Sequence, residues 1–322
     1  MKKILLTLSA AALVLASCAK IETVKVDENR AIEFSSFVGN NTKAVEELTT
    51  KGLSTFYVFA EYGDSESLYG NTVFDNEPNS VDHYWVGGKY YSFGAYANGN
   101  DGQISADSVK FDAASGTLTF NNYEPNDAKD LVAAVAKVQS TAEGTNNPAV
   151  DLNFKHLLSQ VKFTFNTTDA DAYTIAISDL KIVGAISKAN GTYNENINWT
   201  FVEKNGYVYE GISDVADKAN GYSAFVNRLV IPQVNTDALK VTFNATVSGA
   251  GLEEEDKTAS FEATLGVQDS NTWVAGYRYN YTATINADKI DPTLTNKIEF
   301  RVTVNDWSDE DNIITNPTVP QL

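Results

Sequence analysis

Residues 53–62 read LSTFYVFAEY, and this stretch decides the fold class. Between Phe56 and Ala60 the odd and the even positions are both aromatic or apolar, so both faces of a strand here are filled. Such a strand belongs inside a layered β-structure. Tyrosine and phenylalanine, which favour strands, number 16 each in the chain. The stretch therefore predicts the core strand of a β-sandwich.

Further strands are expected on both sides of this stretch. His83–Ala97 predicts two aromatic strands joined by a hairpin at Gly87-Gly88, and Val109–Phe120 predicts a second hairpin around Ser115-Gly116. Ala128–Val138 favours a strand running into a loop, whereas residues 154–158 are compatible with a single helical turn. Other strand patterns lie at residues 161–165, 173–177, 180–186, 199–202, 228–231, 239–247, 259–265, 277–285 and 298–304.

These patterns predict an all-β protein built from β-sandwiches. Many short strands are separated by Gly, Asn and Asp turns, and no stretch carries a sustained helical period. A chain of 322 residues is long enough for two domains, each with its own core. We expect an N-terminal sandwich over residues 31–165 and a C-terminal sandwich over residues 166–322.

The N-terminal segment predicts export. Lys2 and Lys3 precede an apolar run from Ile4 to Ala16, which is shorter than the roughly 20 residues of a membrane-spanning helix. We interpret residues 1–17 as a signal peptide. The sequence Leu-Ala-Ser-Cys ending at Cys18, the only cysteine of the chain, resembles the bacterial lipobox. Acylation of Cys18 would then anchor the protein to a membrane, with residues 18–30 as a tether. The alternative is an ordinary signal peptide with an incidental cysteine.

Composition excludes several classes of function. A formal charge of −18 repels phosphate backbones, so nucleic-acid binding is not expected. A single cysteine leaves no disulfide framework and no zinc-thiolate site. The two histidines, His83 and His156, lie in no recognisable catalytic motif. The acidic residues 306–311 lack the spacing of a calcium-binding EF-hand loop. We expect no catalytic activity, no cofactor and no metal, although a secreted hydrolase with an unrecognised carboxylate pair stays a third option.

A set of motifs spread along nearly the whole mature chain resembles one family, the fimbrillins, which are exported pilin lipoproteins of Bacteroidetes-type bacteria. Each motif is short, but their order along the chain matches that of the family. They are FYVFA at 56–60, YW…YSFGAYA at 84–97, FKHLLSQV at 154–161, GTYN…W at 191–199, LVIPQ at 229–233, WVAGYRYNY at 273–281 and NDW at 305–307.

The resemblance implies two tandem transthyretin-like β-sandwich domains with Greek-key topology. It also implies a pilus subunit that is lipid-anchored at the cell outer membrane and later incorporated into the fimbrium, with cell adhesion as the outcome. In this family a protease removes the N-terminal strand, and a donor strand from another subunit fills the opened groove. The expected partners are therefore other fimbrial subunits, the outer membrane, and a host or bacterial surface ligand.

The removable strand is expected in residues 31–38. Ile32, Phe34, Ser36 and Val38 alternate on one face, and the predicted groove-filling side chains are Phe34 and Val38, followed by Ile32. The family cleaves after an arginine, whereas this chain has Lys43 at the matching position. Lys51 and Arg30 are the alternative cleavage points. A permanent first strand is the competing interpretation.

The C-terminal tail does not decide which position the subunit would take in the pilus. Ile313, Thr315 and Val319 could form a donor strand, but Pro317 and Pro320 each remove a backbone donor. A tail of this kind also suits a tip or accessory subunit, which receives a strand without donating one. The second hypothesis for function is a surface glycan-binding lipoprotein, in which aromatic residues stack on sugars. Its candidate residues are Tyr84, Trp85 and Trp273.

Overall fold

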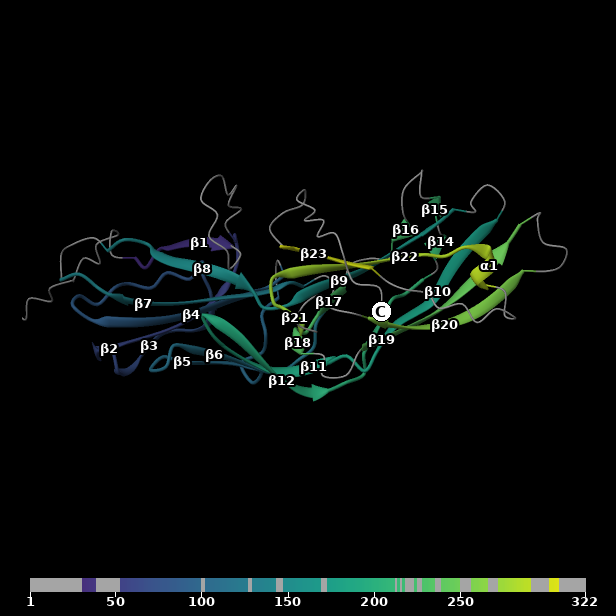
Figure 1. The fold of residues 1–322 in the computed structure, drawn as a ribbon. Helices are drawn as coiled ribbons and strands as arrows, with labels where there is room; N and C mark the ends of the chain where they lie inside the picture. Colours follow the sequence, from purple (N-terminus) through teal and green to yellow (C-terminus); the bar gives the residue numbers. More distant parts are fainter. Residues whose placement is uncertain are drawn as a thin grey trace, which may run out of the picture.

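The computed structural model confirms an all-β fold, with a single short helix among the residues that it describes (Figure 1). Figure 1 shows the strands drawn out along one long axis. The described residues are 31–38, 53–99, 102–126, 129–142, 147–168, 173–211, 213–214, 216–217, 223–224, 228–234, 239–249, 256–265, 272–290 and 301–306.

Two sheets form one end of the molecule. The first sheet has the strand order β1-β8-β7-β4-β2-β3, and the second sheet has the order β12-β11-β6-β5. The strands of the first sheet are β1 (Phe34–Val38), β2 (Tyr57–Ser65), β3 (Leu68–Pro78), β4 (Tyr90–Asn98), β7 (Leu131–Gln139) and β8 (Val150–His156). Those of the second sheet are β5 (Val109–Asp112), β6 (Thr117–Tyr123), β11 (Lys188–Asn194) and β12 (Asn196–Glu203).

Two further sheets form the other end. The third sheet has the order β13-β10-β19-β20 with β14 beside β10, and the fourth has the order β15-β9-β22-β23 with β16 and β17 beside β9. The third comprises β10 (Thr174–Val183), β13 (Tyr207–Val208), β14 (Ser213–Asp214), β19 (Leu239–Ser248) and β20 (Lys257–Leu265). The fourth comprises β9 (Ser159–Thr167), β15 (Ala216–Asp217), β16 (Ser223–Ala224), β17 (Arg228–Val230), β22 (Tyr277–Thr284) and β23 (Arg301–Asp306). The remaining elements are the pair β18 (Gln233–Val234) and β21 (Thr272–Trp273), and helix α1 (Ala287–Ile290).

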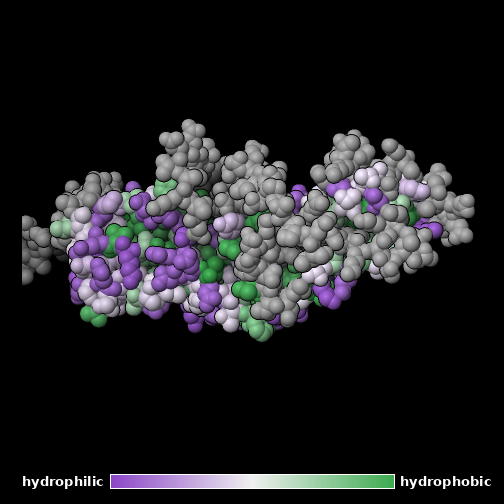
Figure 2. All heavy atoms as spheres, in the orientation of Figure 1, coloured by the Kyte–Doolittle hydropathy of each residue, from purple (hydrophilic) through white to green (hydrophobic). Residues whose placement is uncertain are grey.

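Alternating apolar residues of these strands build three buried clusters. One cluster lies between the third and fourth sheets and contains alternate residues of β9, β10, β19 and β22. A second joins the first sheet, through Phe59 and Tyr96, to Phe120 and Tyr193 of the second sheet. The third cluster covers the other face of the first sheet and contains Phe93. Figure 2 shows mostly hydrophilic residues, with apolar ones among them, on the surface at the end formed by the first and second sheets.

The chain passes from the first sheet to the fourth at Leu157 and Leu158, between β8 and β9. Later in the chain, the hairpin β11–β12 returns to the first end of the molecule, where β11 pairs with β6 of the second sheet. This hairpin lies after the domain boundary expected near residue 165, yet its strand pairing is with the N-terminal part. The division into tandem domains at that residue, and their Greek-key topology, stay predictions.

Two local predictions were wrong. Gly87-Gly88 does not close a hairpin, because β4 pairs with β2 and β7, while Tyr84 forms an isolated bridge with Ala31. Residues 154–156 belong to strand β8 and not to a helical turn. The alternation of buried Leu152 and Phe154 with exposed residues is the signal that favours the strand.

Candidate functional site

Strand β1 lies at one end of the strand order of the first sheet, beside β8 (Figure 1). The two strands are parallel, and all five residues from Phe34 to Val38 have partners in β8. The backbone N–H of Val150 donates to the carbonyl oxygen of Glu33 over 2.7 Å. Parallel pairing is slightly less stable per residue than antiparallel pairing. Strand β1 is thus a short strand at the edge of the first sheet, paired in parallel with β8.

A second backbone contact fixes the start of this segment. The N–H of Ile32 donates to the carbonyl oxygen of His83 over 2.8 Å, next to the bridge between Ala31 and Tyr84. The imidazole of His83 contacts a carboxylate oxygen of Glu77 at 2.6 Å. The contacts of His83 thus support a structural role for this residue. The segment that contains His83 holds residues 31–32 in place through backbone contacts.

The inward face of β1 contributes to the cluster around Phe93. Ile32 is 6% exposed, and Phe34 and Val38 pack against the same cluster. Between them, the hydroxyl of Ser36 donates to the carbonyl oxygen of Leu53 over 3.3 Å. The three side chains expected to fill a groove therefore all face one apolar interior.

Phe34 occupies an aromatic box. Its ring centroid lies 5.7 Å from that of Phe56, 5.6 Å from that of Phe74 and 6.0 Å from that of Phe93. The interplanar angles of 81°, 63° and 86° are edge-to-face arrangements. Each such pair is worth about 0.5–1.5 kcal/mol beyond the burial of its area. Phe34 is thus the main apolar anchor of the strand.

The outward face of β1 is polar or exposed. Ser35 donates its hydroxyl hydrogen to a carboxylate oxygen of Asp151 over 2.5 Å. Phe37 is 40% exposed, and Glu33 is also exposed. Inward anchors thus alternate with outward side chains that contribute little apolar burial.

The surface under β1 is apolar in its own right. Val150, Leu152 and Phe154 of β8 are buried in the same cluster, and the ring centroids of Phe154 and Phe56 lie 5.2 Å apart. If β1 left, this surface would form an apolar groove beside the newly unpaired edge of β8. Chemically, the arrangement is suited to holding an extended segment rather than to catalysis.

Sequence reasoning did not single out the residues that form the box. Phe74 comes from β3, whose pairing with β2 is interrupted by several register shifts, so its alternation is broken. Phe56 and Phe93 lie in aromatic segments whose sequences predict strands, but nothing local indicates which face meets Phe34.

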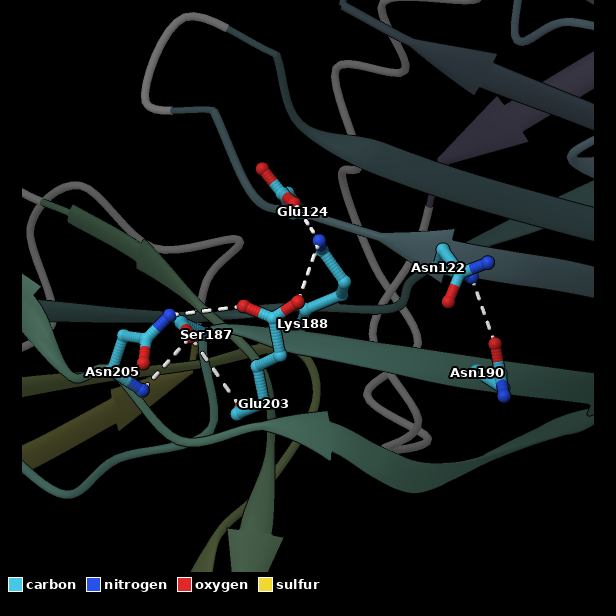
Figure 3. A network of polar contacts seen from close by, with 7 residues as sticks. All are labelled: Asn122, Glu124, Ser187, Lys188, Asn190, Glu203 and Asn205. Atoms are coloured by element: carbon cyan, nitrogen blue, oxygen red, sulfur yellow. Dashed lines mark hydrogen bonds and ion pairs between the residues drawn. The ribbon is translucent and has the colours of Figure 1, made fainter.

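A polar network fastens the hairpin β11–β12 to β6 (Figure 3). The ammonium of Lys188 lies 2.6 Å from a carboxylate oxygen of Glu124 and 2.9 Å from one of Glu203. These contacts raise the pKa of Lys188, and the hydrogen bond and charge of Lys188 lower the pKa of Glu203. Nearby, the backbone N–H of Asn122 donates to the side-chain oxygen of Asn190 over 2.8 Å.

Trp199 of β12 connects this hairpin to the chain between β8 and β9. Its indole N–H donates to the carbonyl oxygen of Leu157 over 3.0 Å, and its ring lies over Gly191. A Cβ on Gly191 would lie 2.7 Å from the ring. The glycine is therefore required by the close approach of the indole.

A cleft of about 290 Å³ opens beside Trp199. Its lining includes His156, whose ring nitrogen lies 2.7 Å from a carboxylate oxygen of Asp130, and the exposed side chains of Val234 and Val274. Trp273 also lines it, but its side chain is buried. The cleft is thus lined by the partly exposed Trp199 together with exposed valines, and not by an accessible Trp273.

The aromatic residues of the glycan hypothesis are mostly inaccessible. Tyr84 is 45% exposed, whereas Trp85 is 3% exposed and Trp273 is fully buried. Buried indoles pack the protein interior and offer no face to a sugar in solvent. Two of the three residues are therefore unsuited to that role.

Several predicted residues lie outside the described part of the chain. These are Cys18, the cleavage candidates Arg30, Lys43 and Lys51, and the tail residues Ile313, Thr315 and Val319. Within the described ranges, no cluster of three His, Cys, Asp or Glu side chains has a metal-binding arrangement. No helix in those ranges is long and apolar enough to span a bilayer.

Comparisons with known proteins agree with this architecture. Residues 25–307 match the model of a family described as fimbrillin-like. A comparison with curated proteins finds no match. Among solved structures, a fimbrial protein from Bacteroides vulgatus superposes with a TM-score of 0.58 at 20% identity, over 87% of this chain and 100% of that one. This likeness shows a shared fold.

Two further structures are similar over most of their length. A candidate cell adhesion protein from Parabacteroides distasonis gives a TM-score of 0.48 at 12% identity, covering 86% of this chain and 96% of that one. A candidate cell adhesion protein from Bacteroides uniformis gives 0.44 at 20% identity, covering 87% and 99%.

Proposed function

The chain belongs to the fimbrillin-like family, and from that premise we propose that it is a fimbrial subunit assembled by strand exchange. In this proposal the precursor is exported and anchored at the outer membrane through acylated Cys18. Proteolysis then separates β1 from the rest of the chain. An extended segment of another subunit takes the place of β1, and the assembled fimbrium serves cell adhesion. The protein has a structural role and no catalytic one.

The observation that carries this proposal is the way β1 is held. The backbone of β1 pairs with β8 at the edge of the sheet. The side chain of Phe34 packs as a large apolar anchor among the rings of the aromatic box. A strand bound in this manner contributes the same kinds of interaction that an incoming segment would make, namely ladder hydrogen bonds and alternate side chains in pockets. An empty groove would expose apolar surface to water, which is unfavourable. Once β1 has left, a groove filled by another segment is therefore expected to be strongly favoured over an empty one.

The three cleavage candidates differ in whether a cut at each would separate β1 from the rest of the chain. Lys43 and Lys51 lie between the end of β1 at Val38 and the start of β2 at Tyr57, so a cut at either separates β1 from the body of the protein. Arg30 precedes β1, and a cut there alone would leave β1 attached. We therefore propose Lys43 as the maturation site, with Lys51 as the alternative.

Limited trypsin treatment of the mature chain tests this proposal. The treated protein should take up an added labelled peptide of residues 29–39, which then co-elutes with it in size-exclusion chromatography, and the untreated protein should not take it up. A Lys43→Ala, Lys51→Ala double variant should resist cleavage between β1 and β2 and take up no peptide, whereas Arg30→Ala should behave like the parent. A completely cleaved and folded protein that takes up no peptide would reject assembly by strand exchange.

A further inference from the structure

We propose that the groove under β1 selects a segment with a large aromatic side chain at the position of Phe34. The segment that replaces β1 then comes from a different subunit and not from the tail of another copy of this chain. This inference rests on the proposed function and adds the chemistry of the partner strand.

The selection originates in the aromatic box. Phe56, Phe74 and Phe93 surround the ring of Phe34 at centroid distances of 5.6–6.0 Å, and all three are almost completely buried. Phe74 lies on β3, Phe93 lies on β4 and Phe56 directly precedes β2, so the three rings cannot all move inward to fill the volume of a missing ring. A small side chain at this position would leave a cavity lined by aromatic rings.

The neighbouring inward positions define the rest of the pattern. Ile32 is buried, and Val38 packs on the same cluster, so both positions favour aliphatic side chains. Ser36 lies between them with its hydroxyl on the carbonyl oxygen of Leu53, so this position takes a small residue. A fitting strand therefore has an aliphatic, an aromatic, a small and an aliphatic residue at every second position.

The tail of this chain, WSDEDNIITNPTVPQL at residues 307–322, does not contain this pattern. Its only aromatic residue is Trp307. If Trp307 occupied the box, Asp309 and Asp311 would take the next two inward positions, and burying unpaired carboxylates there is costly.

The register that places aliphatic residues at both outer positions fails at the box. It aligns Ile313 with Ile32 and Val319 with Val38, which puts Thr315 where Phe34 belongs. In this register Pro317 takes the position of Ser36, and proline lacks the N–H that a ladder requires. A shift by two residues toward the N-terminus puts Ile313 in the box but Asp311 at the position of Ile32.

Peptide binding to the full chain tests this inference. A specific protease site is introduced within residues 44–49, and the chain is cut there so that β1 stays bound without a covalent link. Labelled peptides are then exchanged into the cut protein, and their dissociation constants are measured by fluorescence anisotropy. The peptides are residues 29–39, the same peptide with Phe34→Ala, the tail residues 308–320, and that tail with Thr315→Phe.

The peptide 29–39 should bind, and its Phe34→Ala form should bind about 100-fold more weakly, since loss of a buried aromatic ring is costly. The natural tail should bind at least about 100-fold more weakly than peptide 29–39, and Thr315→Phe should recover at least about tenfold of that loss. A natural tail that binds within tenfold of peptide 29–39 overturns this inference but leaves strand exchange intact. If no peptide enters a cut protein that circular dichroism shows to be folded, the proposed function fails, and this inference fails with it.

Discussion

The ring of Phe34 meets the ring of Phe74 at a centroid distance of 5.6 Å, although the two residues lie on strands at opposite ends of the six-stranded first sheet. The sheet must therefore curl until the side chains of its two edge strands touch. Strand β1 closes this curl with side-chain packing, while its backbone ladder runs only to β8 among the described strands. The strand is consequently both part of the core and located at an edge.

Removing the ring of Phe34 should destabilise the protein. We expect Phe34→Ala to lower the free energy of unfolding by about 3 kcal/mol, because the aromatic box would keep a cavity. Phe37 lies on the same strand but is 40% exposed, so Phe37→Ala should change stability by less than about 0.5 kcal/mol. Urea unfolding of the two variants measures both values. Equal effects would show that β1 is held by its backbone alone.

The fold class could be predicted because apolar alternation is a local property. The segment from Ile32 to Val38 shows its buried face in its own sequence, and the apolar run around Phe56 likewise indicates a core strand. The hairpin expected at Gly87-Gly88 failed because glycines indicate a turn but not which strands pair across it.

The rest of the site depends on contacts between distant parts of the chain. The meeting of Phe34 with Phe74 results from the curl of a whole sheet, which no window of sequence contains. Pairing of β11 with β6 likewise joins residues about 70 positions apart, such as Thr192 and Thr119. Residues such as Lys188 therefore acquire their roles only in the folded structure.

The contact between Gly191 and Trp199 should be sensitive to one methyl group. Gly191→Ala would place a Cβ 2.7 Å from the indole, so the ring must move and its hydrogen bond to Leu157 should break. We expect a loss of about 1–3 kcal/mol of stability, with a shift in tryptophan fluorescence. Gly70→Ala is the matched control, since nothing lies within 4 Å of its Cβ position. An unchanged emission spectrum for Gly191→Ala would contradict this packing.

The ion pairs of Lys188 should give a pH-dependent contribution to stability. Because Lys188 lowers the pKa of Glu203 in the folded state, the contribution is present above the ordinary glutamate pKa of about 4.3 and is lost as pH falls through the lowered value. The stability difference between the parent and Lys188→Met should therefore be constant from about pH 6 to 8 and shrink below about pH 4.

Lys240→Met provides the control for this experiment. Lys240 pairs with Glu262, and both side chains are more than half exposed, so little effect is expected at any pH. Urea midpoints measured across the pH range give the comparison. A difference for Lys188→Met that grows toward acid pH would contradict the assigned role of Glu203.

The proposed membrane anchor rests on one residue of the precursor, Cys18. If Cys18 carries acyl chains, Cys18→Ala should move the protein from the membrane fraction to the soluble periplasmic or secreted fraction, since stable anchoring requires those chains. Metabolic labelling with a fatty-acid analogue should label the parent and not the variant. Retention of Cys18→Ala in the membrane fraction would argue against the lipid anchor.

The most direct test of strand exchange is to lock β1 in place. Ser35 and Asp151 are register partners on β1 and β8 whose side chains touch, so Ser35→Cys with Asp151→Cys should allow a disulfide. Thr246→Cys with Thr258→Cys supplies an equivalent link between β19 and β20, away from the groove. The cleaved, oxidised β1–β8 variant should not take up the labelled peptide 29–39 and should take it up after reduction, while the β19–β20 control should take it up in both states. Peptide uptake by the oxidised β1–β8 variant to the same extent as by its reduced form would contradict the account.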